Sequence, residues 1–178
     1  MESLKSHYLA MARYNRWMNE KLYALCGTLS DEERKKDLGA FFGSLHRTLN
    51  HLLVTDRAWM KRITRDAKYD LKDKDGKPLP FQYVSDDHFT DFEELSRERK
   101  QTDLDILALT QSLTPEQIEG PLTYKTAKGD SFTHPLWWAL SHWFNHQTHH
   151  RGQATTLLLQ LGKDPGVTDL VVMLRSGG

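Results

Sequence analysis

The sequence predicts an all-α protein, a four-helix bundle with a long crossover loop and a small β-hairpin before the last long helix. Four long segments repeat apolar residues at helical spacing, which predicts four amphipathic helices. A long polar stretch joins the second segment to the third, and two short β-rich runs precede the fourth. The chain has 178 residues, enough for one domain that buries its own core. We therefore expect a single domain over residues 1–178.

The first helix is predicted from about Leu4 to Leu25. Its apolar residues recur at alternating steps of four and three, and Gly27 follows directly. Asn15 interrupts the apolar stripe, and we interpret it as a core amide with its hydrogen bonds satisfied rather than as a residue near a ligand. Cys26 comes at the end of this helix, where a packed thiol is the simplest interpretation.

The second helix is expected from about Ser44 to Arg62. Before it, Ser30 begins a capping-box sequence that predicts a short helical segment. Two glycines then flank Phe41 and Phe42, which suggests a bend that packs two aromatic rings before the helix begins.

The rest of the chain is interpreted from similar signals. Residues 64–88 are predicted to form the long, polar crossover loop, and capping residues at 90–93 begin the third helix. The charged run at 97–100 is interpreted as a solvated face of that helix. A further turn is expected at 114–117, and residues 122–133 suggest a hairpin with a glycine turn. The last long helix is expected between Pro135 and Gly162, and a short apolar segment follows it.

The last long helix carries the most unusual pattern. Four of the nine histidines fall between positions 142 and 150. At about 100° of rotation per residue, five polar side chains share an arc of roughly 100°. They are His142, His146, His149, His150 and Gln153. The arc continues into apolar residues, so we expect it to point toward a core. A buried row of imidazoles needs a partner, and a metal ion is the partner that this clustering favours.

Helix spacing alone does not choose among these four histidines. One helix face cannot surround an ion, so a third ligand is expected from another segment, and His51 on the second helix is the best-placed candidate. A zinc-protease mechanism is disfavoured, because Gln147 stands where that motif has its glutamate. A ferritin-like di-iron site is disfavoured too, because the chain has no Glu-x-x-His sequence. A mononuclear site with three histidines, of the catalytic type, remains.

Several stretches resemble the DinB (damage-inducible, YfiT-like) family of metalloenzymes. The resemblance covers nearly the whole chain, and its motifs follow one another in the same order as in the family. It rests on the motifs RYNRWMN at 13–19, GAFFGSLHRTLNHLL at 39–53, DRAW at 56–59 and NHQTHHRGQ at 145–153.

This resemblance implies a four-helix bundle, often a homodimer, with a divalent metal held by His51, His146 and His150. Zinc and nickel are the ions commonly found in the family. The implied activity is metal-dependent activation of a low-molecular-weight thiol, which is transferred through its sulfur to an electrophile in detoxification or stress response. The competing interpretation is a non-catalytic metal-binding protein whose bundle is closed by the ion.

Four polar residues near these motifs have two interpretations each. Asn50 and Asn145 precede proposed ligands, and they either make local hydrogen bonds or orient an imidazole. Asp56 either orients an imidazole or pairs with a basic residue. Arg151 lies on the far side of the helix from the histidine arc, so we expect a packing or salt-bridge role for it.

Composition excludes several other classes of function. The 24 basic and 24 acidic residues balance, which argues against nucleic-acid binding. No apolar run approaches the roughly 20 residues of a membrane span. The first residues lack the apolar core of a signal peptide, and the single cysteine cannot form an internal disulfide. We therefore expect a soluble, cytoplasmic protein, and apolar stripes that serve a bundle core or a dimer interface equally well.

Overall fold

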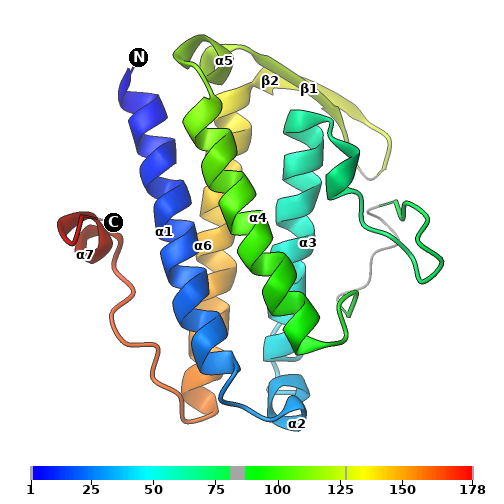
Figure 1. Ribbon diagram of the computed structural model, residues 1–178, viewed down its shortest axis with the longest axis vertical. Coiled ribbons are helices and arrows are strands. Elements are labelled where there is room, and N and C mark those ends of the chain that lie inside the picture. Colours follow the sequence, from blue (N-terminus) through cyan, green and yellow to red (C-terminus); the bar gives the residue numbers. More distant parts are fainter. Residues whose placement is uncertain (1, 81–86, 127, 178) are drawn as a thin grey trace.

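A computed structural model shows the four-helix bundle that the sequence predicts (Figure 1). The structure describes residues 2–80, 87–126 and 128–177. The long helices are α1 (Glu2–Cys26), α3 (Leu45–Thr64), α4 (Phe92–Ser112) and α6 (Leu136–Gln160). The short elements are α2 (Asp31–Lys35), the 3-10 helix η1 (Ala67–Tyr69), α5 (Pro115–Glu119), β1 (Pro121–Lys125), β2 (Ser131–Pro135) and α7 (Leu170–Arg175). None of the described helices combines the length and apolar character that crossing a membrane requires.

The long helices pack in the order α1, α4, α3, α6 around the bundle axis. Each contacts its two neighbours in this order, and α1 with α4 and α3 with α6 are the two pairs with the most extensive contact. The pair α1 and α4 therefore lies across the bundle from the pair α3 and α6 (Figure 1). This arrangement puts the histidines of α3 and α6 on one side of the molecule.

Polar caps fix where several helices begin, as the sequence predicts. The side chain of Ser44 accepts a hydrogen bond from the backbone of Arg47 at the start of α3. Ser30 forms the capping box of α2, and Asp91 caps α4. These bonds satisfy backbone N–H groups that have no partner within the helix.

The crossover between α3 and α4 is only partly irregular. It contains η1 and an isolated bridge between Lys72 and Pro78. The predicted loop also includes residues 81–86, which lie outside the described part of the chain.

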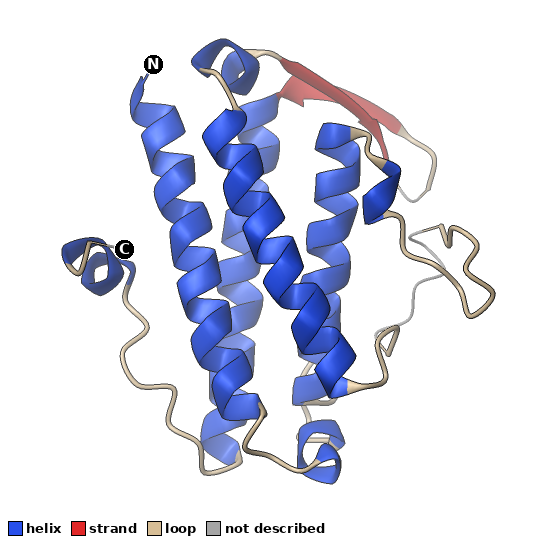
Figure 2. Ribbon diagram, in the orientation of Figure 1, coloured by secondary structure: helices blue, strands red, loops and turns tan. Residues whose placement is uncertain are grey.

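The hairpin sets the start of α6. Its strands are antiparallel, with Pro121 opposite Pro135 and Lys125 opposite Ser131. Figure 2 shows it at one end of an otherwise helical molecule. The backbone N–H of Leu136, the first residue of α6, donates to the carbonyl of Gly120 at 2.8 Å. The end of the hairpin and the beginning of the histidine helix are therefore held together.

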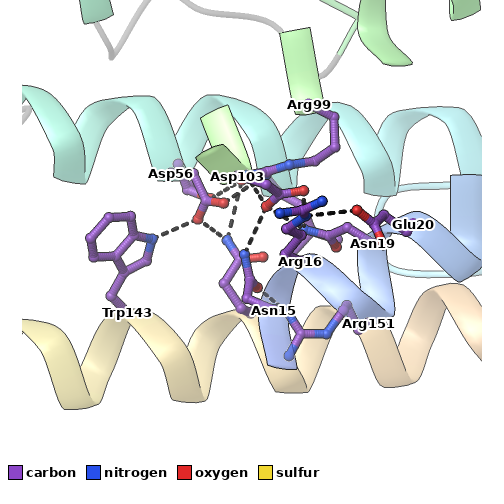
Figure 3. Close-up of polar contacts among 12 residues, drawn as sticks. Asn15, Arg16, Asn19, Glu20, Asp56, Arg99, Asp103, Trp143 and Arg151 are labelled. Atoms are coloured by element: carbon purple, nitrogen blue, oxygen red, sulfur yellow. Dashed lines mark hydrogen bonds and ion pairs between the residues drawn. The ribbon is translucent and has the colours of Figure 1, made fainter. Parts of the chain in front are cut away.

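A buried polar network crosses the middle of the bundle (Figure 3). Asp56 is fully buried, and its carboxylate accepts hydrogen bonds from Arg99 at 2.6 Å, from the Trp143 indole at 2.6 Å and from the Gln147 amide. Arg99 also pairs with Asp103 at 2.8 Å. Burial raises the pKa of Asp56 to about 6, and the Arg99 guanidinium opposes this rise. The ion pair with Arg99 and the hydrogen bonds from Trp143 and Gln147 favour the ionised form of Asp56.

The network corrects one prediction from the sequence. The run 97–100 was expected to be a solvated face, but Arg99 is only 2 % exposed. Burial alone lowers the pKa of an arginine, but Asp103 and Asp56 outweigh it, and the pKa of Arg99 is raised. The guanidinium stays charged inside the bundle because two carboxylates compensate it.

Replacing Asp56 should destabilise the protein strongly. Asp56→Ala leaves Arg99 buried without one of its two carboxylates, and breaking a buried pair in this way costs about 3–5 kcal/mol. Urea unfolding followed by circular dichroism measures the change. Glu20→Ala is the matched control, because Glu20 forms an exposed pair with Arg16 at 2.7 Å and should change stability by less than about 1 kcal/mol. Equal losses in the two variants would contradict the role given to Asp56.

Candidate metal centre

Three imidazole rings converge between α3 and α6. His51 comes from α3, and His146 and His150 come from α6 one helical turn apart. The Nε2 atoms of His51 and His146 are 3.2 Å apart. One candidate ligand atom from each of the three histidines lies within 4.8 Å of the others. This group contains the three histidines that the resemblance nominates.

The orientation of one ring is fixed by a neighbour on the same helix. The Nδ1 atom of His150 lies 2.8 Å from the side-chain oxygen of Gln153. A carboxamide oxygen only accepts hydrogen bonds, so this nitrogen carries the proton. The other ring nitrogen, Nε2, is then an acceptor with a free electron pair.

The rings are held in their neutral form. Burial, together with a smaller effect of the neighbouring imidazoles, lowers the pKa of His51 to about 4 and that of His146 to about 3. Burial also lowers the pKa of His150. Neutral imidazole is the form that binds metal ions.

The group fits a divalent ion that prefers nitrogen ligands. Bonds of about 2.0–2.1 Å in a tetrahedral zinc site separate two ligand nitrogens by roughly 3.3 Å. The 3.2 Å between His51 and His146 is close to this value. Two neutral rings at this distance share at most one N–H between the facing nitrogens. In the described part of the chain, no carboxylate or cysteine joins the group.

An aromatic ring from the loop before α3 covers one side of the group. Phe42 stacks on His51 with ring centroids 4.2 Å apart, and it lies 5.3 Å from the ring of His150. Gly43, the next residue, has φ of +79°, a conformation that favours glycine. The Phe41 ring meets the Phe42 ring edge-on, with centroids 4.9 Å apart, but it is 84 % exposed. The bend predicted from the sequence therefore brings one of its two rings against a ligand candidate.

Comparison with known proteins assigns this chain to a family. The model of the DinB family matches residues 2–177. The chain belongs to the DinB family. It is 25 % identical over 157 residues to the protein DinB of Bacillus subtilis (strain 168), a match that covers 88 % of this chain and 87 % of that protein.

Two solved structures have a similar fold. A DinB-like protein from Bacillus cereus ATCC 10987 has a TM-score of 0.57 and 20 % identity, covering 84 % of this chain and 90 % of that one. YfiT from Bacillus subtilis has a TM-score of 0.59 and 19 % identity, covering 90 % and 89 %. YfiT is described as a probable metal-dependent hydrolase with an unusual four-helix bundle topology.

The other histidines of the arc lie beside the group without joining it. His142 is exposed, with its ring 5.9 Å from that of His146. His149 is also exposed, with its ring 4.8 Å from that of His150. The expectation that the whole arc points into a core is therefore wrong for these two residues. The arc lies at the edge of the bundle, because the adjacent α6 face with Trp143 takes the interior.

Asn50 and Asp56 serve the bundle rather than the imidazoles. Asn50 donates to the carbonyl of Phe89 at 3.0 Å and accepts from the Phe89 N–H at 2.8 Å, which holds the segment before α4. Asp56 pairs with Arg99, so the basic-partner interpretation is confirmed. Asn145 is exposed on α6.

Arg151 and Asn15 form a buried contact between α6 and α1. Arg151 donates to the Asn15 side-chain oxygen, and its guanidinium lies 5.2 Å from the centre of the Tyr14 ring. The Asn15 amide also donates to Asp103 at 3.1 Å. The packing role expected for Arg151 and the satisfied amide expected for Asn15 are both confirmed.

Two contacts of the site were not inferred from the sequence. The bond from His150 to Gln153 joins residues three apart on a helix, a spacing at which side chains meet, so helix geometry could have indicated it. The stacking of Phe42 on His51 joins a loop to a helix, and no sequence pattern signals it.

Removing the Phe42 ring should destabilise the site region. Phe42→Ala deletes a mostly buried ring, a change that costs about 3 kcal/mol in protein cores. The neighbouring Phe41→Ala is the matched control, because its exposed ring should contribute less than about 0.5 kcal/mol. Chemical denaturation compares the two variants. A loss in Phe42→Ala no larger than that in Phe41→Ala would show that the stacked ring does not stabilise the fold.

Proposed function

We propose that this protein is a divalent-metal-dependent enzyme that transfers a low-molecular-weight thiol to an electrophile. The metal ligands in this proposal are His51, His146 and His150, with one zinc or nickel ion per chain. The observation that carries the proposal is the convergence of three neutral imidazoles from two helices within 4.8 Å.

The donor set supports a reactive rather than a purely structural site. Three neutral nitrogen ligands leave an ion its full charge and at least one open position. When bound, such an ion supplies Lewis-acid chemistry that favours the deprotonated form of a water or thiol beside it. A closed structural site would need a fourth protein ligand, and the group contains none among the described residues.

The chain's own residues prepare this site in three ways. His51, His146 and His150 present neutral nitrogens at fixed positions. Gln153 accepts the Nδ1 proton of His150, which keeps the opposite nitrogen free for bonding. Phe42 covers one face of His51 and excludes water from that side.

The sulfur in the proposed reaction comes from a substrate. The only cysteine of the chain, Cys26, is fully buried, and burial raises the pKa of its thiol to about 12. A protonated, buried thiol is not a nucleophile. In the proposed reaction the small thiol loses its proton, and its sulfur forms a bond to an electrophilic carbon as the leaving group departs. The choice of a thiol rests on the resemblance of the chain to thiol-transferring members of the family.

Metal-dependent hydrolysis is a second candidate. It is favoured by the similarity to YfiT, which is described as a probable metal-dependent hydrolase. Gln147 does not argue for or against it, because this side chain is fully buried and donates to Asp56 instead of facing the histidines. The two candidates differ in whether a thiol is consumed.

The proposal also includes a cellular setting and an assembly. It places the protein in the cytoplasm, in detoxification or stress response, as a single-domain chain over residues 1–178 that forms a homodimer.

Metal content should depend on the three proposed ligands. Wild-type protein prepared without a tag should carry about one zinc or nickel ion per chain. His51→Ala and His150→Ala should reduce this to background without loss of helical circular dichroism, whereas His149→Ala should retain the ion. Mass spectrometry of metals measures the content. Failure of the wild type to take up zinc or nickel, or an equal loss in His149→Ala, would contradict the ligand assignment.

Thiol consumption should depend on the metal. With 1-chloro-2,4-dinitrobenzene as electrophile and a panel of small thiols, the metal-loaded protein should accelerate thiol loss. His51→Ala should abolish the acceleration and Cys26→Ala should leave it unchanged. Parallel reactions with p-nitrophenyl acetate and no thiol test the hydrolase candidate. Metal-dependent ester cleavage without thiol consumption would favour hydrolysis over transfer.

A further inference from the structure

A surface pocket of about 380 Å³ lies where the C-terminal end of α3 meets the hairpin. This volume is within the range of small-molecule sites in proteins. Four of the side chains that line the pocket are cationic, and they are Lys61, Arg62, Arg65 and Lys125. Among the residues that the structure describes, no carboxylate lines it. The proposed metal chemistry uses none of these residues.

Neighbouring groups hold the two arginines of the pocket in place. Arg65 donates to the carbonyl of Thr123 on β1 at 3.0 Å. A guanidinium has five N–H donors, so this bond leaves others for a ligand. Arg62, one turn earlier on α3, lies over the rings of Trp59 and Tyr124, at 4.7 and 5.3 Å from their centres. A cation that is oriented before binding loses less conformational entropy when a ligand binds.

A ligand can reach the pocket from solvent. Arg65, Lys125 and Ser131 are exposed, and the Lys61 side chain is 37 % exposed. The charged end of a long basic side chain is normally the part that faces water. Lys125 and Ser131 are opposite one another in the hairpin, so their side chains lie on the same face of it. The pocket therefore offers a guanidinium, an ammonium and a hydroxyl to a dissolved molecule.

The charges around the pocket favour an anion with more than one negative charge. Lys61 is compensated by Asp70, whose carboxylate lies 3.0 Å away. Asp66 and Asp130 adjoin lining residues in the sequence, but neither of them lines the pocket. The last turn of α3 contributes about half a unit of negative charge from its carbonyl groups. The other three cations of the pocket outweigh this partial charge.

We propose that the pocket between α3 and the hairpin binds a small molecule that carries at least two negative charges, as carboxylates or as a phosphate group. Both groups accept hydrogen bonds from guanidinium and ammonium side chains. In the proposed complex, Arg65 at the end of α3 and Lys125 on β1 contact different oxygens of the ligand. The pocket shares no lining residue with the metal centre, and its occupancy does not require a metal.

Three carboxylates of matched length test the proposal on the full-length protein. Tricarballylate, glutarate and valerate share a five-carbon chain and carry three, two and one carboxylates. Backbone amide chemical shifts, followed by NMR during titration in about 0.1 M salt, measure weak affinities of this kind. Affinity should rise about two- to fivefold with each added carboxylate, the usual effect of one exposed ion pair.

A second pair of compounds separates the two kinds of acidic group. Glycerol 3-phosphate carries a phosphate and glycerol does not, so only the first should bind. Tighter binding of glycerol 3-phosphate than of glutarate would assign the pocket to phosphate compounds, and the reverse order would assign it to carboxylates.

Variants locate the binding. Arg65→Asn and Lys125→Ala each remove one cation and should lower the affinity for tricarballylate about two- to fivefold. Asparagine suits the backbone of Arg65, which is left-handed with φ of +60°. Lys36→Ala is the matched control, because Lys36 is an exposed lysine at the end of α2, at the opposite end of the bundle (Figure 1). Salt screens a charge at that distance, so the control should not change the affinity.

The variant His51→Ala separates this site from the metal centre, because carboxylates also bind metal ions. Tricarballylate should bind this variant as tightly as it binds the wild type, whether or not the proposed metal chemistry is correct. Loss of binding in His51→Ala would place the anion on the metal ion and overturn the proposal. Absence of saturable binding, equal affinity for the three carboxylates, or equal losses in Lys36→Ala and Lys125→Ala would also overturn it.

Discussion

Asp56 places a negative charge from α3 in the middle of the bundle, and its oxygens accept hydrogen bonds from two other helices at once. Arg99 approaches from α4, while Trp143 and Gln147 approach from α6. Successive residues of a helix point about 100° apart, so fixing Gln147 inward turns the adjacent imidazole to the side. This rotation directs the histidines of α6 toward His51 at the edge of α3. An entirely apolar interface specifies helix rotation less strictly, because apolar contacts have no direction.

The same network also connects α4 with α1 and α1 with α6. From Arg99 it continues through Asp103 to Asn15, and from Asn15 to Arg151 on α6. Arg151 directly follows His150 in the sequence, so the network holds α6 at the residue next to one of the three clustered histidines (Figure 3).

Local patterns in the sequence were enough for the helices, the caps and the hairpin, because each depends on residues close in the chain. Contacts between distant segments were not accessible in this way. Arg99 looked like part of a solvated run because its partner Asp56 is 43 residues away. Helix spacing did not show which of the four histidines on α6 are the candidate metal ligands. That choice depends on how α6 is rotated against α3. The family resemblance indicated His51, His146 and His150, which the structure brings together. The role of these three histidines in metal binding is a prediction.

The reactivity of the Cys26 thiol can report how often the helical bundle opens. It is the only cysteine, it ends α1, and it is fully buried in the core with its thiol protonated. An alkylating reagent can reach the sulfur only when the surrounding helices separate, so the rate of modification counts opening events. The closed protein also offers no thiol that could form a mixed disulfide with a small molecule. A cysteine introduced on the surface would consequently be the single site for a spectroscopic label.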